Sequence, residues 1–254
     1  MEKNSKILLM FSGGRDSFLT ACRLLDSENN YILKLVTYDN GCSWCSDNVK
    51  MVADRLINMY GKDRVEYLGV YNISAVIREF FPLYFNKKPS FILKEYGELP
   101  PSQVHCLMCR TSMYIYSIWL CKKMNISMIA EGGRKCQKFV IELPGMLKNR
   151  YPNLLNGEKS KKLGIDIQLI TPVYDLVSDW KRDNELIGRG FLSKTYEPKC
   201  MIGYPAEDSV DDIVIKSIHN FFDKAMIPVI YRLLTEGNVN QFFPFDRSKT
   251  EIHD

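Results

Sequence analysis

Apolar runs and helix-spaced apolar positions alternate along most of this chain. Segments of strand length occupy residues 7–11, which are apolar throughout, and residues 31–38, 64–70, 126–131 and 165–173, which are mainly apolar. Apolar residues at helical spacing predict helices over residues 18–25, 46–60, 74–81, 107–124 and 178–188. Strands that alternate with helices are typical of a doubly wound parallel α/β sheet, in which ligands bind at the carboxyl ends of the strands.

Two further segments stand apart from this alternation. Residues 148–162 are polar and basic, and we expect a mobile surface loop there. Residues 208–237 have helical spacing, Pro228 is expected to kink or divide that helix, and its apolar residues suit core packing or a homodimer face. We therefore expect a main domain over residues 1–205 and a helical C-terminal extension over residues 206–254, packed on it and frayed from residue 247 onward.

A glycine turn, Ser12-Gly13-Gly14-Arg15-Asp16-Ser17, separates the first predicted strand from the first predicted helix. Glycines permit close backbone approach and unusual dihedral angles. The start of a helix presents unpaired N–H groups and a partial positive charge. Strand, glycine turn and helix together form an anion cradle that suits phosphate. This turn differs from the common phosphate loop, in which four residues separate the glycines and a lysine follows.

The string SGGRDS at residues 12–17 resembles the SGGxDS signature of the PP-loop ATP pyrophosphatases, which adenylate a substrate and release pyrophosphate. The resemblance implies an adenine nucleotide alpha hydrolase-like, Rossmann-like fold that binds ATP and Mg²⁺, with Asp16 as a catalytic residue in contact with Mg²⁺. Phe11 and Tyr38 end adjacent predicted strands and are expected to flank the adenosine, while Gly132 gives room for the α-phosphate. The candidate ATP-binding residues are Phe11, Ser12, Gly13, Gly14, Arg15, Asp16, Ser17, Tyr38 and Gly132.

Two cysteines three positions apart, Cys106 and Cys109, lie at the predicted start of the long helix, where the helix N-terminus favours thiolates. A third, Cys200, follows much later in the chain. This order resembles the cluster-dependent tRNA 2-thiocytidine synthetases and the nickel-pincer-cofactor sulfur transferases. The resemblance implies that Cys106, Cys109 and Cys200 hold a [4Fe-4S] cluster with one iron left open for a transferable sulfide, which also makes Cys106 and Cys109 catalytic candidates.

A second cysteine pair is compatible with a different metal, zinc. Cys42 and Cys45 follow the second predicted strand and, together with Cys106 and Cys109, would form a zinc site of two knuckles. Persulfide or redox chemistry without a metal is a third option. The remaining cysteines lack partners at metal spacing: Cys22, Cys121 and Cys136. Cys22 and Cys121 fall within predicted helices, where inert buried thiols are expected.

The predicted function is an ATP-dependent sulfur transferase or ligase that releases pyrophosphate and takes sulfur from a donor. The segment after Glu131, Gly132-Gly133-Arg134-Lys135, does not match the corresponding motif of either thiolation family, so the acceptor stays open between tRNA and a small molecule. The alternatives are a PP-loop enzyme that installs nitrogen, and a non-catalytic ATP- or AMP-binding module with structural zinc. Four basic residues could neutralise phosphate or be solvated: Arg15, Arg110, Arg134 and Lys135.

Composition changes this picture little. The 254 residues carry a formal charge of +4 and are 46% hydrophobic, which suits a large α/β domain and permits nucleic-acid binding without requiring it. No secretory signal or membrane-length apolar run is present, so we expect a cytoplasmic protein without membrane partners. In that compartment the eight cysteines are not expected to form disulfides. His105 and His219 are expected to be exposed.

Overall fold

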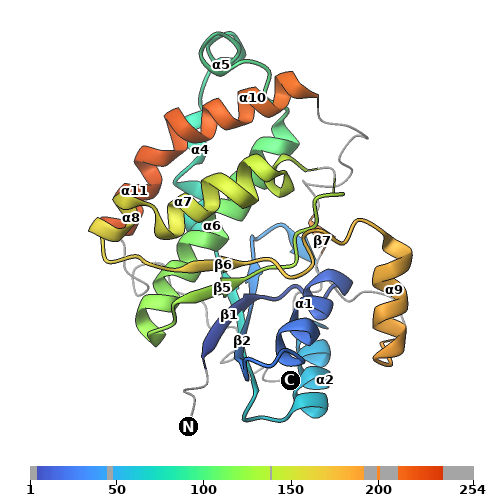
Figure 1. The fold of residues 1–254 in the computed structure, drawn as a ribbon. Coiled ribbons are helices and arrows are strands. Elements are labelled where there is room, and N and C mark those ends of the chain that lie inside the picture. Colours follow the sequence, from blue (N-terminus) through green and yellow to red (C-terminus); the bar gives the residue numbers. More distant parts are fainter. Residues whose placement is uncertain (1–4, 45–47, 138, 192–198, 201–210, 237–254) are drawn as a thin grey trace, which may run out of the picture.

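The computed structural model describes residues 5–44, 48–137, 139–191, 199–200 and 211–236. Five parallel strands form the main sheet in the order β4-β2-β1-β5-β6, and Figure 1 labels β2, β1, β5 and β6. Strand order reverses beside β1, because β2 lies on one side of it and β5 on the other. The strands are β1 (Lys6–Met10), β2 (Ile32–Asp39), β4 (Val65–Asn72), β5 (Met128–Ala130) and β6 (Gln168–Ile170). The glycine turn therefore leaves the sheet at its topological switch point, where such folds bind ligands.

Helices cover both faces of this sheet (Figure 1). Alternate side chains of β1 explain the two layers, because Ile7 and Leu9 belong to one buried cluster while Leu8 and Met10 belong to the other. The first cluster includes α1 (Arg15–Leu25), α2 (Val49–Tyr60) and α9 (Asp179–Gly188). The second includes α3 (Ser74–Arg78), α6 (Pro101–Met124), α7 (Tyr151–Asn156), α10 (Asp212–Phe221) and α11 (Ile227–Glu236). The predicted doubly wound α/β class is confirmed.

The long helix α6 begins at Pro101 rather than at residue 107. Proline suits the first helical position, because its missing N–H would be unpaired there anyway. The prediction that Cys106 and Cys109 lie at the start of this helix is therefore wrong, since both lie inside it. The helix ends at Asn125, which adopts a left-handed conformation with φ of 52°.

The basic segment 148–162 is helical and is not a loop, which corrects the expectation from its charge. It comprises the end of a π-helical turn (Gly145–Arg150), α7 and α8 (Glu158–Lys162). Tyr151, Leu154 and Leu155 are buried against the core, and the lysines of α8 lie on the outside. Its charged residues concealed an amphipathic pattern.

Proline and short strands account for the remaining differences. The predicted helix over residues 74–81 is shorter, because α3 ends at Arg78 and Pro82 lies in the first turn of a separate helix, α4 (Phe81–Tyr84). Pro228 does divide the C-terminal helix, as expected, and a π-helical turn (Phe222–Met226) joins α10 to α11. A helix α5 (Pro89–Tyr96) and an antiparallel pair, β3 (Ser43–Trp44) with β7 (Lys199–Cys200), were not predicted.

In the described part of the chain, no helix has both the length and the apolar character needed to cross a membrane. The predicted domain boundary near residue 205, the fraying of residues 247–254 and Cys45 lie outside the described residues.

Candidate functional site

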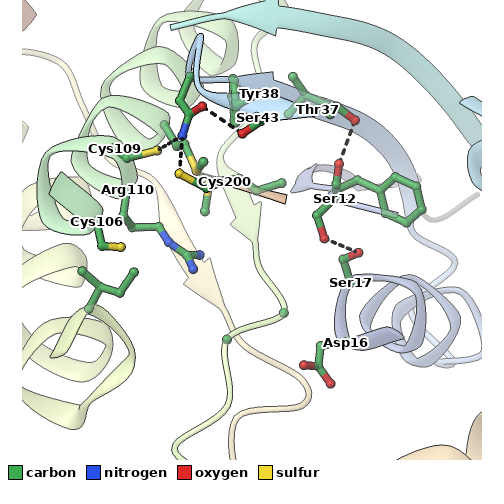
Figure 2. A pocket seen from close by; sticks show the side chains of 18 of the residues that line it. Ser12, Asp16, Ser17, Thr37, Tyr38, Ser43, Cys106, Cys109, Arg110 and Cys200 are labelled. Atoms are coloured by element: carbon green, nitrogen blue, oxygen red, sulfur yellow. Dashed lines mark hydrogen bonds between the residues drawn. The ribbon is translucent and has the colours of Figure 1, made fainter. Parts of the chain in front are cut away.

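A cavity of about 320 Å³ opens at the carboxyl edge of the main sheet. Figure 2 shows cysteines at one end of it and Ser12, Asp16 and Ser17 at the other. The structure thus brings together most of the predicted site residues, which line this one cavity: Phe11, Ser12, Asp16, Ser17, Tyr38, Cys106, Cys109, Gly132 and Cys200. The predicted residues Gly13, Gly14 and Arg15 belong to the same turn but are not part of the lining.

The glycine turn is closed by its own serines. Ser17 Oγ donates to the Gly14 carbonyl at 3.0 Å and lies 3.2 Å from Ser12 Oγ. Gly13 has φ of +72° and packs against Val49, so a side chain there would be strained. Gly14 is the N-cap of α1 and provides no side-chain acceptor, which leaves the first-turn N–H groups available to an anion.

Gly132 brings the end of β5 against the start of α1. A Cβ atom at this position would lie 2.8 Å from the Ser17 nitrogen and 2.9 Å from the Asp16 carbonyl carbon. These are backbone atoms of the glycine turn, and they cannot rotate away. The residue is therefore required for close packing against the predicted phosphate loop, which is a different reason from the room for an α-phosphate that the sequence suggested.

Two buried arginines hold Asp16. Its Oδ1 atom lies 2.9 Å from Arg134 Nε and 3.3 Å from Arg182 Nη1, and Gln137 Nε2 donates to Oδ2 at 3.3 Å. The hydrogen bond from Arg134 lowers the pKa of Asp179, which shares the two arginines. The two arginines are therefore shared among the carboxylates of Asp16, Asp179 and Asp183 beside the N-terminus of α1.

Sequence reasoning missed Arg182, which lies 166 positions after Asp16. Helix α9 places it beside the glycine turn, and the helical spacing of residues 178–188 was the only signal for that helix. Arg15 pairs with Asp183 at 2.9 Å, and Lys135 pairs with Asp175 at 3.0 Å. Of the four basic residues considered from the sequence, Arg134 is thus the one that contacts Asp16.

A second buried charge network lies beside the cysteines. Arg110 lines the cavity, and its guanidinium lies 2.9 Å from Glu131 Oε2 and 3.3 Å from Glu142 Oε1. Tyr114 donates its hydroxyl to Glu131 Oε2 at 2.7 Å. Burial raises the pKa of Glu142 to about 8, and the Arg110 cation opposes that rise. One arginine facing two carboxylates therefore favours a protonated Glu142 at neutral pH.

Asn40 connects the cysteines of two distant segments. Its Nδ2 atom lies 3.5 Å from the Sγ atoms of both Cys109 and Cys200, as the dashed lines in Figure 2 mark. Cys200 reaches this point because β7 pairs with β3 immediately after the Asn40 turn. Burial raises the pKa of Cys106 to about 12 and that of Cys109 to about 11, so the expected thiolate stabilisation by a helix start is absent.

Three thiols around the cavity are the predicted ligands of a metal group. Among the described residues, no three Cys, His, Asp or Glu side chains are placed to hold a metal ion. A zinc ion draws its sulfurs to about 2.3 Å from a single centre. In a four-iron cluster each thiolate binds a different iron, so the ligands surround a wider space. Cys106, Cys109 and Cys200 around one cavity fit that arrangement.

The other cysteines and histidines divide by burial. Cys22 and Cys121 are buried within α1 and α6, as expected, whereas Cys136 is exposed. Cys42 is half-buried in the turn beside Cys200, and its proposed zinc partner Cys45 lies outside the described residues. The expectation that His105 is exposed is wrong, because this residue is 2% exposed, lines the cavity, and has Nε2 at 4.0 Å from Cys200 Sγ.

Comparison with known proteins gives matches in structure alone. No protein-family model matches the sequence, and no curated protein matches it. A 4-thiouridine synthetase, solved as an RNA complex with bound ATP, matches with a TM-score of 0.53 and 16% identity over 92% of this chain. The match spans 54% of that synthetase, about half its length.

Two further solved structures match with lower TM-scores. The U34-tRNA thiolase NcsA from Methanococcus maripaludis, solved with its [4Fe-4S] cluster, has a TM-score of 0.46 and 15% identity over 99% of this chain and 80% of its own. NMN synthetase from Francisella tularensis has a TM-score of 0.40 and 12% identity over 96% and 89%. The likeness to the synthetase confirms the predicted fold.

Proposed function

We propose that this chain is an ATP-dependent sulfur transferase that adenylates an oxygen of its substrate and replaces that oxygen with sulfur. One observation carries the proposal: the glycine turn and the three cysteines line the same cavity, at opposite ends. An activating site and a sulfur site that share one cavity can act on one bound substrate without releasing the activated intermediate.

The activating half consists of the glycine turn and its arginines. ATP binds with its β- and γ-phosphates at the N-terminus of α1, where the free N–H groups and Arg134 and Arg182 oppose their charge. The substrate oxygen attacks the α-phosphorus, and pyrophosphate leaves. Asp16 would hold Mg²⁺, which would supply charge shielding for the phosphates. Phe11 and Tyr38 flank the adenosine at the cavity wall.

The sulfur half consists of Cys106, Cys109 and Cys200, which would hold a [4Fe-4S] cluster. When bound, such a cluster supplies an open iron for a transferable sulfide. The sulfur forms a bond to the activated carbon, and the substrate oxygen leaves with AMP, so that the oxygen count balances. Arg110 lies between the two halves, where it can orient the substrate.

The acceptor proposed is a nucleobase of tRNA, with a small molecule as the alternative. The solved synthetase that shares this fold binds RNA and ATP, which supports a nucleic-acid acceptor. The positive formal charge of the chain is compatible with it. Labelled sulfide, Mg²⁺-ATP and unmodified tRNA distinguish the acceptors, because sulfur appears in the tRNA nucleosides only if tRNA is the substrate.

Substitution of Asp16→Asn tests the activating half. We expect substrate-dependent ATP–pyrophosphate exchange to fall by about 100-fold, because the arginines and Mg²⁺ lose their carboxylate and the phosphates are misplaced. Asp166→Asn is the control, since Asp166 is exposed and its ion pair with Lys161 spans 3.9 Å. Unchanged exchange in Asp16→Asn would show that Asp16 is not part of the activating half, and a wild type without substrate-dependent exchange would show that adenylation is the wrong reaction. Release of AMP and product that ammonia supports and sulfide does not would point to nitrogen transfer.

A further inference from the structure

Asn40 occupies a central place in the sulfur half that the proposed chemistry does not yet use. It follows β2 directly, is 7% exposed, and lines the cavity. Its Oδ1 atom accepts hydrogen bonds from the Cys42 backbone N–H and from Ser43 Oγ, both at 2.8 Å. Two donors on Oδ1 determine the orientation of the carboxamide, so the NH₂ group must face the opposite way.

The opposite side holds the two sulfurs. Nδ2 lies 3.5 Å from Cys109 Sγ and 3.5 Å from Cys200 Sγ, within the range of an N–H···S hydrogen bond. An NH₂ group has two protons and can donate one to each sulfur. The two sulfurs belong to α6 and β7, and they are no farther apart than twice that distance. One side chain therefore donates to both thiols and ties them to the turn after β2.

We propose that Asn40 is the positioning residue of the sulfur half, which holds Cys109 and Cys200 at their spacing and donates one N–H to each thiolate once iron is bound. This inference rests on the proposed cluster. Hydrogen bonds to ligand sulfur withdraw electron density and raise the reduction potential of an iron–sulfur group, and partners of this kind also orient the ligands. Asn40 thereby favours the reduced state of the bound group.

The Asn40→Asp variant tests the two hydrogen-bonding roles of this residue separately. Aspartate keeps the acceptor for Cys42 and Ser43 and so keeps the turn, but it places an anionic oxygen where the sulfurs had a donor. Asn72→Asp is the matched control. Asn72 ends the neighbouring strand β4, and its Oδ1 accepts from the Ser74 N–H at 2.9 Å and from Ser74 Oγ at 2.6 Å. Within the described part of the chain no hydrogen bond joins Asn72 to a sulfur. Both variants undergo the same chemical change at the same sheet edge.

The full-length proteins are reconstituted anaerobically with iron and sulfide, and iron content and midpoint potential are measured by redox titration. We expect the control to match the wild type. In Asn40→Asp we expect either loss of bound iron with the fold intact by circular dichroism, or a tenfold shift of the redox equilibrium toward the oxidised form, about 59 mV for one electron.

The neutral variant Asn40→Ser keeps the inference testable if the Asn40→Asp protein does not fold. Its hydroxyl can support the turn but is too short to reach both sulfurs, so its potential should fall between those of the wild type and Asn40→Asp. Potentials and iron contents equal to the wild type in both Asn40 variants would overturn the inference alone. A wild-type protein that takes up no iron would overturn the proposed cluster, and with it this role of Asn40.

Discussion

Gly132→Ala introduces one methyl group between β5 and the glycine turn. The new Cβ would lie 2.8 Å from the Ser17 nitrogen and 2.9 Å from the Asp16 carbonyl carbon, so the end of β5 and the start of α1 must separate. Overpacking of this kind costs about 1–3 kcal/mol. Because the displaced atoms belong to the phosphate cradle, we expect ATP affinity to fall as well, by more than the loss of folding stability alone would cause.

Gly188→Ala provides the matched control. Gly188 is the last residue of α9, and nothing lies within 4 Å of the position that its Cβ would take. Alanine there should leave the protein unchanged or stabilise it by up to about 1 kcal/mol. Urea unfolding gives the free energies, and calorimetric titration with Mg²⁺-ATP gives the affinities. Equal unfolding free energies and equal ATP affinities for the two variants would refute the reasoning about close packing at Gly132.

Two further predictions address the sulfur half of the site. The pKa of Glu142 is raised to about 8 in the folded protein, so between the ordinary carboxyl pKa and pH 8 the folded state binds more protons than the unfolded state. The free energy of unfolding should therefore fall as pH rises toward 8. Glu142→Gln should flatten that part of a plot of urea midpoint against pH. Cys106→Ser should abolish bound iron and sulfur transfer but keep ATP–pyrophosphate exchange, whereas Cys121→Ser, in the same helix but outside the cavity lining, should keep all three. An unchanged pH profile in Glu142→Gln, or loss of exchange in Cys106→Ser, would contradict these expectations.

The sheet and the glycine turn could be predicted because their signals are local. Each core strand is a short apolar run, and the turn at residues 12–17 combines glycines, a strand before it and a helix after it. The start of α6 could not be predicted from apolar spacing, because its first turn contains Pro101 and polar residues. The helices α7 and α8 could not be predicted either, because their polar and basic residues are more numerous than the buried apolar residues of α7.

The partners within the site are not local, and the sequence carries no signal for them. Arg182 meets Asp16 because α9 packs on α1, a contact between segments 166 positions apart. Asn40 meets Cys109 and Cys200 because a two-residue strand pair forms beside it. Periodicity predicts that an element exists but not which side chains two elements bring together. The candidate residues for binding phosphate and a cluster could therefore be chosen from the sequence, while the residues that contact them could not.

The two halves of the site are also joined by a short mechanical connection. Arg110 follows Cys109 in α6, and its guanidinium is bound to Glu131. Glu131 precedes Gly132, which packs on the backbone of Asp16 and Ser17. A shift of the cysteines would thus be transmitted through a buried ion pair to the phosphate cradle, and the reverse also holds. Because buried ion pairs and close backbone contacts do not deform gradually, occupancy of one half should alter affinity at the other. Iron-loaded and iron-free protein should accordingly differ in their Kd for ATP, and the difference should vanish in Arg110→Met, where the connection is broken while the apolar stem remains.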